Sequence, residues 1–371
     1  MSDIDELEPP PDDSVVGTIA RRPNSVRRTA NINMVWPGGP GTGLQLRGRA
    51  RDLLTQDDGT PVVLDEASMV VDIAAMRTID GITVTPEHPT IDKLVGAQGG
   101  SYLRTAIDEA VPGEREQGTP LHFLLDDIAG ASLIAGMALS QGRKAGDPVP
   151  EGAPPLGTGM GGRPVMTQNP FGNAPGGADL GPEAPSARVA PDQVGMRKGR
   201  IICSGLRPNG FMQIKRERGE FAVHFLRTAG DLTSDDPWAW HDIEPAPEYC
   251  MRRRRRIDAW REGDAIAIDV HFRDSLWNVD HVELALHEYT VQAKVDLATG
   301  TLEEIEALPR VLPFPECPWA APNATMLVGH DIGGFRTDVQ RTLTELQCCT
   351  HLNDMLRGLT EVPRFASAVL V

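Results

Sequence analysis

The sequence repeats one pattern in its two halves, and this repeat restricts the possible fold more than any other feature. The matching segments, in chain order, are Val26-Arg27-Arg28 and Met251-Arg252-Arg253, Arg51-Asp52 and Arg273-Asp274, Leu94-Val95-Gly96 and Leu327-Val328-Gly329, and Thr119 with Leu121 and Thr350 with Leu352. Matches that keep one order across whole halves indicate a tandem duplication. The alternative is a chain of two unrelated α+β domains in which the matches arose by chance.

Each half shows the pattern of strands followed by helices. Alternation marks the strands: Ile266, Ile268 and Val270 point one way, and Asp269 and His271 point the other. The predicted fold class is therefore α+β, with two tandem related modules, each an antiparallel sheet followed by two helices packed on one face. Strands are expected at 26–36, 44–54, 61–76, 82–86, 251–260, 265–274, 283–295 and 302–306, and helices at 101–110, 120–139, 335–346 and 350–359.

Composition divides the chain into four regions. Residues 1–20 are acidic and proline-rich, which predicts a disordered tail, and residues 143–196 are rich in Pro and Gly, which predicts a flexible linker. A degenerate N-terminal module then spans residues 21–142, and a C-terminal module with the candidate site spans 197–371. Such a linker would let the modules pair as a pseudo-dimer within one chain. Further short strands are expected at 200–204, 211–216 and 220–225.

The charge and the apolar pattern exclude several classes of protein. The net charge of −16 repels phosphates, so a general nucleic-acid binder is not expected. No apolar run approaches the roughly 20 residues that span a bilayer, and the acidic N-terminus lacks the features of a signal peptide. We therefore expect a cytoplasmic protein without membrane association, whose five cysteines stay reduced.

Thiols and an imidazole gather near the C-terminus. Cys317 follows a Pro-rich loop, and Cys349 and His351 stand where a helix is expected to begin. Thiolate and imidazole are the usual ligands of zinc. A helix N-terminus also lowers the pKa of a thiol, which favours Cys349 as an anionic ligand or nucleophile. The expected zinc ligands are Cys317, Cys349 and His351, with Asp274 or His287 as a further ligand.

Two neighbouring residues of a predicted strand complete the candidate site. His287 and Glu288 are expected to be catalytic, orienting a ligand or shuttling a proton. In the alternative interpretation, the cysteines are buried filler, since free Cys packs as a small hydrophobe, and His351 caps its helix. No CxxC pair is present to decide between the two. The remaining thiols are expected to be structural; they are Cys203, Cys250 and Cys348.

Residues 252–256 are five consecutive arginines. On a strand, alternation divides these charges between two faces. One interpretation is an anion clamp, because guanidinium groups bind carboxylate or phosphate in a bidentate manner. The other is pairing with nearby Asp and Glu side chains, and we expect this second arrangement.

The same residues carry a resemblance to a known family. Residues 245–365 resemble a bacterial family catalogued as domain of unknown function 2889, with Glu288 where that family tends to have Asp. The resemblance implies no established activity, although members of the family often lie near genes for aromatic or acyl-CoA catabolism. In the first half, which looks like a degenerate copy, His88-Pro89 stands at the Cys317-Pro318 position. The segments that carry the likeness are Asp274, His287-Glu288, Cys317-Pro318 and Cys349-Thr350-His351.

The second half also looks like the iron–sulfur scaffold proteins IscU and SufU at the level of fold. Those proteins share a β-meander, a Cys in a loop and a Cys/His pair that opens the last helix. The resemblance implies a site formed by Asp274, Cys317, Cys349 and His351. A shared fold does not fix function, so this resemblance adds candidate ligands but no activity.

The leading functional hypothesis is a zinc-dependent hydrolase or lyase that acts on a small organic metabolite, aromatic or acyl in kind and anionic. One alternative is a non-enzymatic metal or sulfur scaffold, or a binding module with a structural metal site. Another is a metal-free enzyme with a Cys349 nucleophile and a His287 base. An open three-ligand site beside a pocket favours the enzyme, and a closed four-ligand site favours the scaffold.

Overall fold

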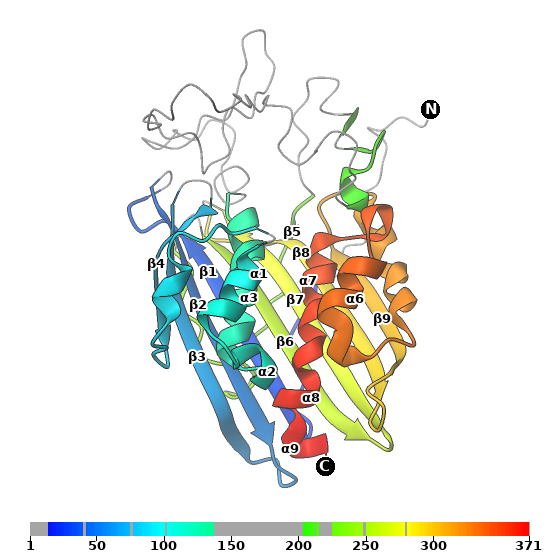
Figure 1. The fold of residues 1–371 in the computed structure, drawn as a ribbon. Helices are drawn as coiled ribbons and strands as arrows, with labels where there is room; N and C mark the ends of the chain where they lie inside the picture. Colours follow the sequence, from blue (N-terminus) through cyan, green and yellow to red (C-terminus); the bar gives the residue numbers. More distant parts are fainter. Residues whose placement is uncertain are drawn as a thin grey trace, which may run out of the picture.

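The computed structural model describes residues 14–39, 42–74, 77–100, 102–136, 203–211, 213–214, 225–247, 250–278 and 280–370. In this part of the chain both halves contribute to one antiparallel sheet, in the order β4-β3-β2-β1-β6-β7-β8-β5, with β9 also paired to β8 (Figure 1). The α+β class is confirmed, and the linker predicted at 143–196 lies outside the described residues. The strands are β1 Ser25–Val35, β2 Leu44–Thr55, β3 Pro61–Ile73, β4 Ile79–Thr85, β5 Arg227–Thr228, β6 Met251–Glu262, β7 Ala265–Trp277, β8 Glu283–Asp296 and β9 Leu302–Val311.

Strands β1 and β6 join the two halves of the sheet. They pair antiparallel, with Arg28 opposite Ile257 and Ile32 opposite Arg253. In the sequence repeat, Arg28 matches Arg253 and Ile32 matches Ile257. Each arginine therefore lies opposite the isoleucine of the other half, so the pairing is reciprocal. All 11 residues of β1 are buried, because strands flank both of its edges and other segments cover both of its faces.

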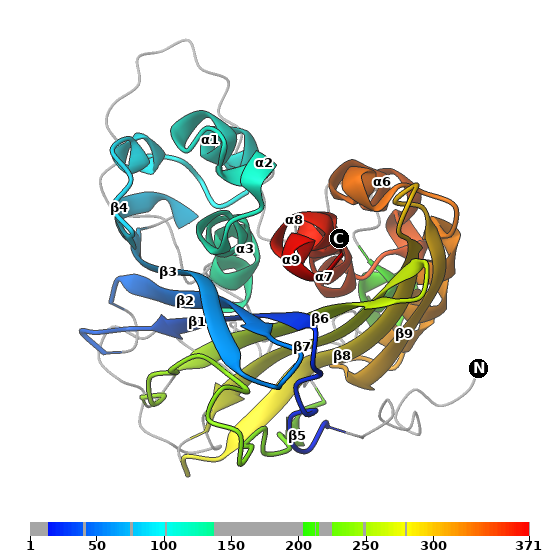
Figure 2. The same ribbon diagram turned by 90° about the horizontal axis from the view of Figure 1, so that it is seen from below.

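Helices cover one face of the curved sheet (Figure 2). Helix α3 begins at Pro120 because the side chain of Thr119 accepts a hydrogen bond from the backbone N–H of His122, and proline suits the first helical position. It packs on β1, β2 and β3, and also contacts α7 of the other half. Every helix in the described ranges is too short or too polar to cross a membrane. The α-helices are α1 Leu103–Ala110, α2 Glu114–Gln117, α3 Pro120–Ile134, α6 Phe335–Thr342, α7 Thr350–Gly358, α8 Val362–Phe365 and α9 Ser367–Leu370.

Two extended segments, residues 14–20 and 225–247, lie on the opposite face, which we call the open face (Figure 2). Residues 14–20 differ from the expected disordered tail. Ser14 Oγ donates a hydrogen bond to Glu288 over 2.7 Å, and Arg273 donates one to the carbonyl oxygen of Val15 over 2.8 Å. Glu288 and Arg273 are fully buried in the sheet, so they need such partners, and this requirement orders the segment.

The segment before β6 differs from the strands expected at 200–204 and 211–216. Ser204–Leu206 forms a short 3₁₀ helix and Phe211 is helical, whereas most of 220–225 lies outside the described residues. Proline and glycine at positions 205, 208 and 210 explain the difference, since they favour turns over a paired strand. The chain then reaches β5, which adds only two residues to the sheet.

The arginine run occupies β6 and alternates between the two faces as expected. The predicted pairing with acidic side chains is confirmed for three members of the run. Arg253 pairs with Asp274 at 2.8 Å, Arg255 with Asp127 at 2.6 Å and Arg256 with Asp269 at 2.5 Å. Arg252 and Arg254 lack such a carboxylate at hydrogen-bond distance among the described residues.

Candidate metal centre

Three predicted site residues meet beneath the helices, where β7, β8 and α7 adjoin. Asp274 on β7 stands directly opposite His287 on β8 in the strand register. His351 lies in the first turn of α7, which places its ring above the same point of the sheet. Asp274 is completely buried and His287 is 7% exposed. The sheet register and the start of α7 therefore bring together residues that are far apart in the sequence.

The distances in this cluster are those of donors that can share an ion. One donor atom from each residue lies within 4.8 Å of the other two. Asp274 Oδ2 is 3.7 Å from Nδ1 of His287 and 3.9 Å from Nε2 of His351, which is too long for hydrogen bonds. Donors about 2.1 Å from a tetrahedral ion are roughly 3.4 Å apart, so these separations are close to those of a metal site.

The two imidazole rings are stacked, with centroids 3.4 Å apart and an interplanar angle of 20°. Nitrogen lone pairs lie in the ring plane, so those of two stacked rings run parallel instead of meeting at one point. Binding of an ion by both rings would therefore require a modest rotation of one ring about its side-chain bonds. His351 retains 15% exposure of its side chain, which leaves room for this rotation on the outer side of the cluster.

The electrostatic surroundings keep His351 neutral and Asp274 oriented. Burial, together with the charges of Arg253 and Arg255, lowers the pKa of His351 to about 3. A neutral imidazole is the form that binds metal. Arg253 donates to both oxygens of Asp274, over 2.8 and 3.0 Å, which fixes the carboxylate in place. Asp127 lies 3.4 Å from the same guanidinium group and partly neutralises it.

The close approach of α3 to this cluster depends on Gly130. A Cβ atom at this position would stand 2.2 Å from Nη1 of Arg253. A side chain here would therefore displace the buried guanidinium group. The glycine therefore lets the helix of the first half pack directly over the arginine of the second half.

The cysteines do not join this cluster. Within the described ranges, Asp274, His287 and His351 are the only group of three or more such donors at metal-binding separations. Cys317 and Cys349 are 7% and 5% exposed and belong to the hydrophobic core. Cys317 Sγ packs so closely on Gly205 that a Cβ there would lie 2.6 Å away. Their surroundings are therefore those of small apolar side chains.

The pKa of Cys349 is raised overall, although its helix N-terminus acts in the expected direction. Burial has the largest effect and raises the value, although the neighbouring Tyr289 and the backbone N–H groups of His351 and Leu352 act in the opposite direction. Burial likewise raises the pKa of Cys317 well above its usual range. Both thiols are thus protonated at neutral pH in the metal-free protein, which disfavours either as a nucleophile.

His287 and Glu288 point to opposite faces of the sheet, because side chains alternate along a strand. Glu288 lies on the open face, where Nε2 of His271 is 2.7 Å away and Arg273 donates to it over 2.8 Å. It is therefore separated by the sheet from Asp274 and His351, and the structure does not bring it to the site at which a proton shuttle was expected. The alternation of side chains along β8 is the sequence signal from which this separation could have been predicted.

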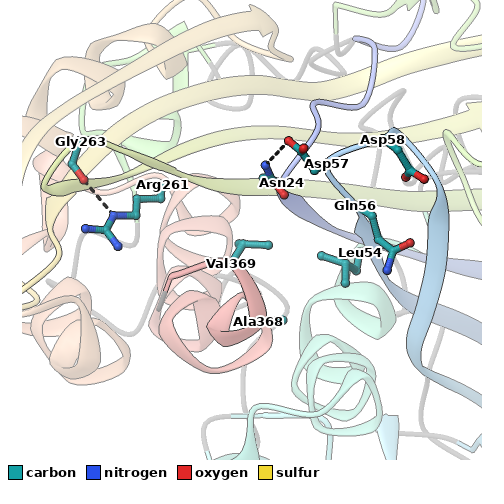
Figure 3. Close-up of a pocket in the computed structure, with 9 residues that line it drawn as sticks. All are labelled: Asn24, Leu54, Gln56, Asp57, Asp58, Arg261, Gly263, Ala368 and Val369. Atoms are coloured by element: carbon teal, nitrogen blue, oxygen red, sulfur yellow. Dashed lines mark hydrogen bonds between the residues drawn. The ribbon is translucent and has the colours of Figure 1, made fainter.

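One large cavity of the described structure lies away from this cluster. This open cavity measures about 910 Å³. It is lined by the start of β1, the turn between β2 and β3, the turn between β6 and β7, and the C-terminal helix α9 (Figure 3). Arg261 there bonds to the carbonyl oxygen of Gly263 in its own turn, and Asn24 bonds to Asp57. The described lining of this cavity includes neither histidine nor cysteine.

The fold and the cluster define an α+β protein with one curved antiparallel sheet, one helical layer and a buried His-His-Asp group. Residues 251–364 match the model of a family described as "Protein of unknown function (DUF2889)". The match covers the expected C-terminal segment and includes Asp274, His287, Cys317, Cys349 and His351. No curated protein and no solved structure matches the chain. The degenerate N-terminal copy and the likeness to IscU and SufU stay predictions.

Proposed function

We propose that Asp274, His287 and His351 bind one divalent transition metal ion, zinc in the first place, and that the protein is a metal-dependent hydrolase or lyase. The observation that carries this proposal is the set of 3.7 and 3.9 Å separations between Asp274 and the two imidazole nitrogens. Two imidazoles and one carboxylate are donors that zinc accepts in catalytic sites. This ligand set replaces the expected one of Cys317, Cys349 and His351.

Three protein ligands leave a coordination position for water or substrate. A bound zinc ion supplies Lewis acidity and lowers the pKa of a bound water molecule to about 7. Of the three ligands, His351 has the most exposed side chain, and it marks the side from which a small molecule would approach. The substrate class, a small aromatic or acyl metabolite, rests on the family resemblance alone and is part of the proposal.

Arg253 has a positioning role in this proposal. Its two hydrogen bonds hold Asp274 in one orientation, as outer-shell partners of metal ligands do. Its positive charge opposes a cation, but Asp127 at 3.4 Å and Asp354 at 3.8 Å offset that charge. Asp127 also pairs with Arg255 at 2.6 Å, so these carboxylates offset only part of the positive charge around the cluster.

A structural metal site in a non-enzymatic protein is the second candidate. The burial of Asp274 favours it, because closed sites are built from fully enclosed ligands. A metal-free enzyme with a Cys349 nucleophile is less well supported, since burial raises the pKa of that thiol. Binding of an added ligand distinguishes the open catalytic site from the closed structural site. An open site binds added imidazole or azide at the ion, and a closed site does not.

The test is metal content per chain after zinc loading and removal of free zinc. We expect about one ion in the wild type, in line with a three-ligand site, and a loss of most of it in His287→Ala, His351→Ala and Asp274→Asn. Cys317→Ala and Cys349→Ala should keep the ion, as should the control His330→Ala, which changes a partly exposed histidine outside the cluster.

Substitution of zinc by cobalt gives a second readout. A thiolate ligand adds strong near-ultraviolet charge-transfer absorption, which the His-His-Asp site lacks. Such absorption, or metal loss in the cysteine variants with full retention in the histidine variants, would contradict the proposed ligand set.

We further infer that the two halves arose by duplication and pair as a pseudo-dimer within one chain. The reciprocal β1–β6 register supports this, as do the two equivalent ion pairs, Arg28 with Asp52 and Arg253 with Asp274. Each arginine also meets a carboxylate from a helical segment of the other half, Glu361 for Arg28 and Asp127 for Arg253. Reciprocal contacts of this kind are those of a two-fold interface.

A further inference from the structure

The open face of the sheet contains a second cavity, which lies across the sheet from the candidate metal centre. It measures about 860 Å³ and is formed by β2, β6, β8 and the segment 231–243. The side chains on which the argument rests are Arg51, Arg254, Trp238, Trp240, His241 and Glu283. Its size is that of a site for a small organic molecule.

Two arginines of this cavity lack the partners that buried arginines normally have. Arg51 is 6% exposed, and its one hydrogen bond goes to the carbonyl oxygen of Trp238, over 2.9 Å. The nearest carboxylate to Arg254, that of Glu283, lies 3.9 Å away. The Nε groups of both side chains are buried without a hydrogen-bond partner in the part of the chain that the structure describes. Each leaves a charged donor unsatisfied, at a free-energy cost.

Other buried arginines of the same sheet show what is missing. Arg27 has a carboxylate oxygen at 2.6 Å, Arg28 at 2.5 Å and Arg253 at 2.8 Å. The sequence therefore supplies acidic partners where the arginines are structural. Within the described residues, Arg51, Arg252 and Arg254 lack such a partner, and of these Arg51 and Arg254 line the cavity, where their donors are available to a ligand.

A third arginine adds positive charge at the edge of this cavity. Arg252 bonds to the side chain of Asn33, over 2.6 Å, and to the carbonyl oxygen of Glu244, both of them neutral groups. Burial lowers the pKa of Arg252 to about 10. Burial also lowers the pKa of His241 to about 3, and Arg51, Arg49, Arg252 and Arg254 act in the same direction. Four arginines therefore surround His241 with positive charge.

The acidic groups around the rim are already engaged. Asp236 accepts from Arg21 over 2.6 Å, and Asp242 accepts from Arg49 over 3.0 Å. Glu283 accepts from Ser275 over 2.6 Å, which holds it at its distance from Arg254. Asp231 accepts from Thr233 over 2.9 Å. None of these carboxylates, as described, neutralises Arg51 or Arg254 by a direct hydrogen bond.

An aromatic side chain forms one wall. Trp238 is 37% exposed, an unusual exposure for a large indole, and Arg51 lies 5.4 Å from its ring centroid. A planar group of a ligand could rest on the same ring, since indole faces attract flat and cationic groups. Guanidinium donors near an exposed indole are typical of sites for anions that carry a planar group.

We propose that this cavity binds a small organic anion, with its phosphate or carboxylate group held by Arg51 and Arg254 and its planar group against Trp238. The sheet separates this site from Asp274, so it is a second site, independent of metal binding. The ligand neutralises the charge of the two guanidinium groups.

The test is titration calorimetry at constant ionic strength with three probes: phenyl phosphate, benzoate and inorganic phosphate. We expect saturable binding of phenyl phosphate or benzoate, and the stronger of the two identifies the oxyanion. Arg51→Gln and Arg254→Gln should each weaken binding about tenfold to a hundredfold, the effect of one charged hydrogen bond. Trp238→Ala should weaken the aromatic probes while leaving inorganic phosphate unchanged.

Arg310→Gln is the matched control, because it removes one positive charge from another cavity of the open face. It should bind as the wild type does, and His287→Ala should also do so if the two sites are independent. Denaturation curves identify any arginine variant that fails to fold, and Arg254→Lys then replaces it, with weakened binding expected. Absence of saturable binding for all three probes, or unchanged affinity in the Arg51 and Arg254 variants, would overturn the proposal.

Discussion

The two halves of the sheet each contain one buried arginine–aspartate pair, and the two pairs differ in what surrounds them. Arg28 on β1 pairs with Asp52 on β2, and Arg253 on β6 pairs with Asp274 on β7. Both pairs point toward the helices and are almost completely buried. The backbone arrangement is therefore the same twice, and only the neighbouring side chains decide what each pair can do.

At Arg28 the neighbours complete a closed charge network. Glu361 accepts from Arg28 over 2.5 Å and lies 2.8 Å from Nδ1 of His122. The residue opposite Asp52 is Asp65, which is exposed. At Arg253 the corresponding strand position is His287, and His351 covers it from the helix. The first half thus surrounds its pair with further charges, whereas the second half places two imidazoles beside an equivalent carboxylate.

The largest effect is expected from removal of the closed network. Arg28→Met leaves Asp52 and Glu361 as buried carboxylates without their shared cation. Breaking a buried ion pair on one side costs about 3 to 5 kcal/mol, and we expect a loss of this size in the free energy of unfolding, measured by denaturant titration.

Arg22→Met is the matched control for this substitution. Arg22 is exposed and stacks over Trp260 at 4.4 Å, so its removal should cost at most about 1 kcal/mol. Equal losses in the two variants would show that the network around Arg28 is not structural, and the contrast between the halves would then fail.

An intermediate effect is expected from metal binding. A ligand that binds only the folded state at 100 times its Kd stabilises it by about 2.7 kcal/mol. Zinc should therefore raise the unfolding free energy of the wild type but not of His287→Ala. Asp65→Ala, which changes the equivalent position of the first half, should respond to zinc as the wild type does. A zinc response lost in Asp65→Ala, or retained in His287→Ala, would reverse the assignment of roles.

Much of the fold could be predicted from local patterns. Alternation in β7 and the turn residues between strands located the hairpins, and the repeated segments located the two halves. The pairing of β1 with β6 could not be predicted in the same way, because the choice between edge strands depends on contacts between distant parts of the chain. The sequence did not predict that residues 14–20 are ordered, for a related reason. Their order depends on Arg273 and Glu288, whose buried side chains require hydrogen-bond partners.

The candidate site was predicted in part. Asp274 and His351 were expected as ligands, and His287 was expected as a catalytic group or a further ligand. Cys317 and Cys349 were expected because thiols are strong zinc ligands, but their chemistry depends on burial, which local sequence does not reveal. Glu288 was placed beside His287 on sequence adjacency, although strand alternation sends it to the open face, where it bonds to Arg273.

The smallest effect concerns pH, and it tests whether the second half carries the acid-sensitive groups. Burial lowers the pKa of His351 to about 3, that of His241 to about 3 and that of His271 to about 4, from an ordinary value of 6.5. At pH values between the folded-state pKa of such a histidine and its ordinary pKa, the unfolded chain binds a proton that the folded chain does not. Folding stability should therefore fall as the pH decreases from about 6.5, by up to about 1.4 kcal/mol per pH unit for each such histidine.

Asp127 acts in the opposite direction, because burial raises its pKa to about 6 and the folded state binds its proton first. Burial also raises the pKa of Asp52, but with three histidines against these two carboxyl groups the net slope still favours loss of stability in acid. Denaturant titrations at pH 7 and pH 5 should show this loss, and His351→Ala should reduce it by about 1 to 2 kcal/mol. His88→Asn, in the first half, should leave the difference between the two pH values unchanged. If it changes the difference as much as His351→Ala does, acid sensitivity is a property of both halves, and the contrast drawn from the two arginine–aspartate pairs does not extend to protonation.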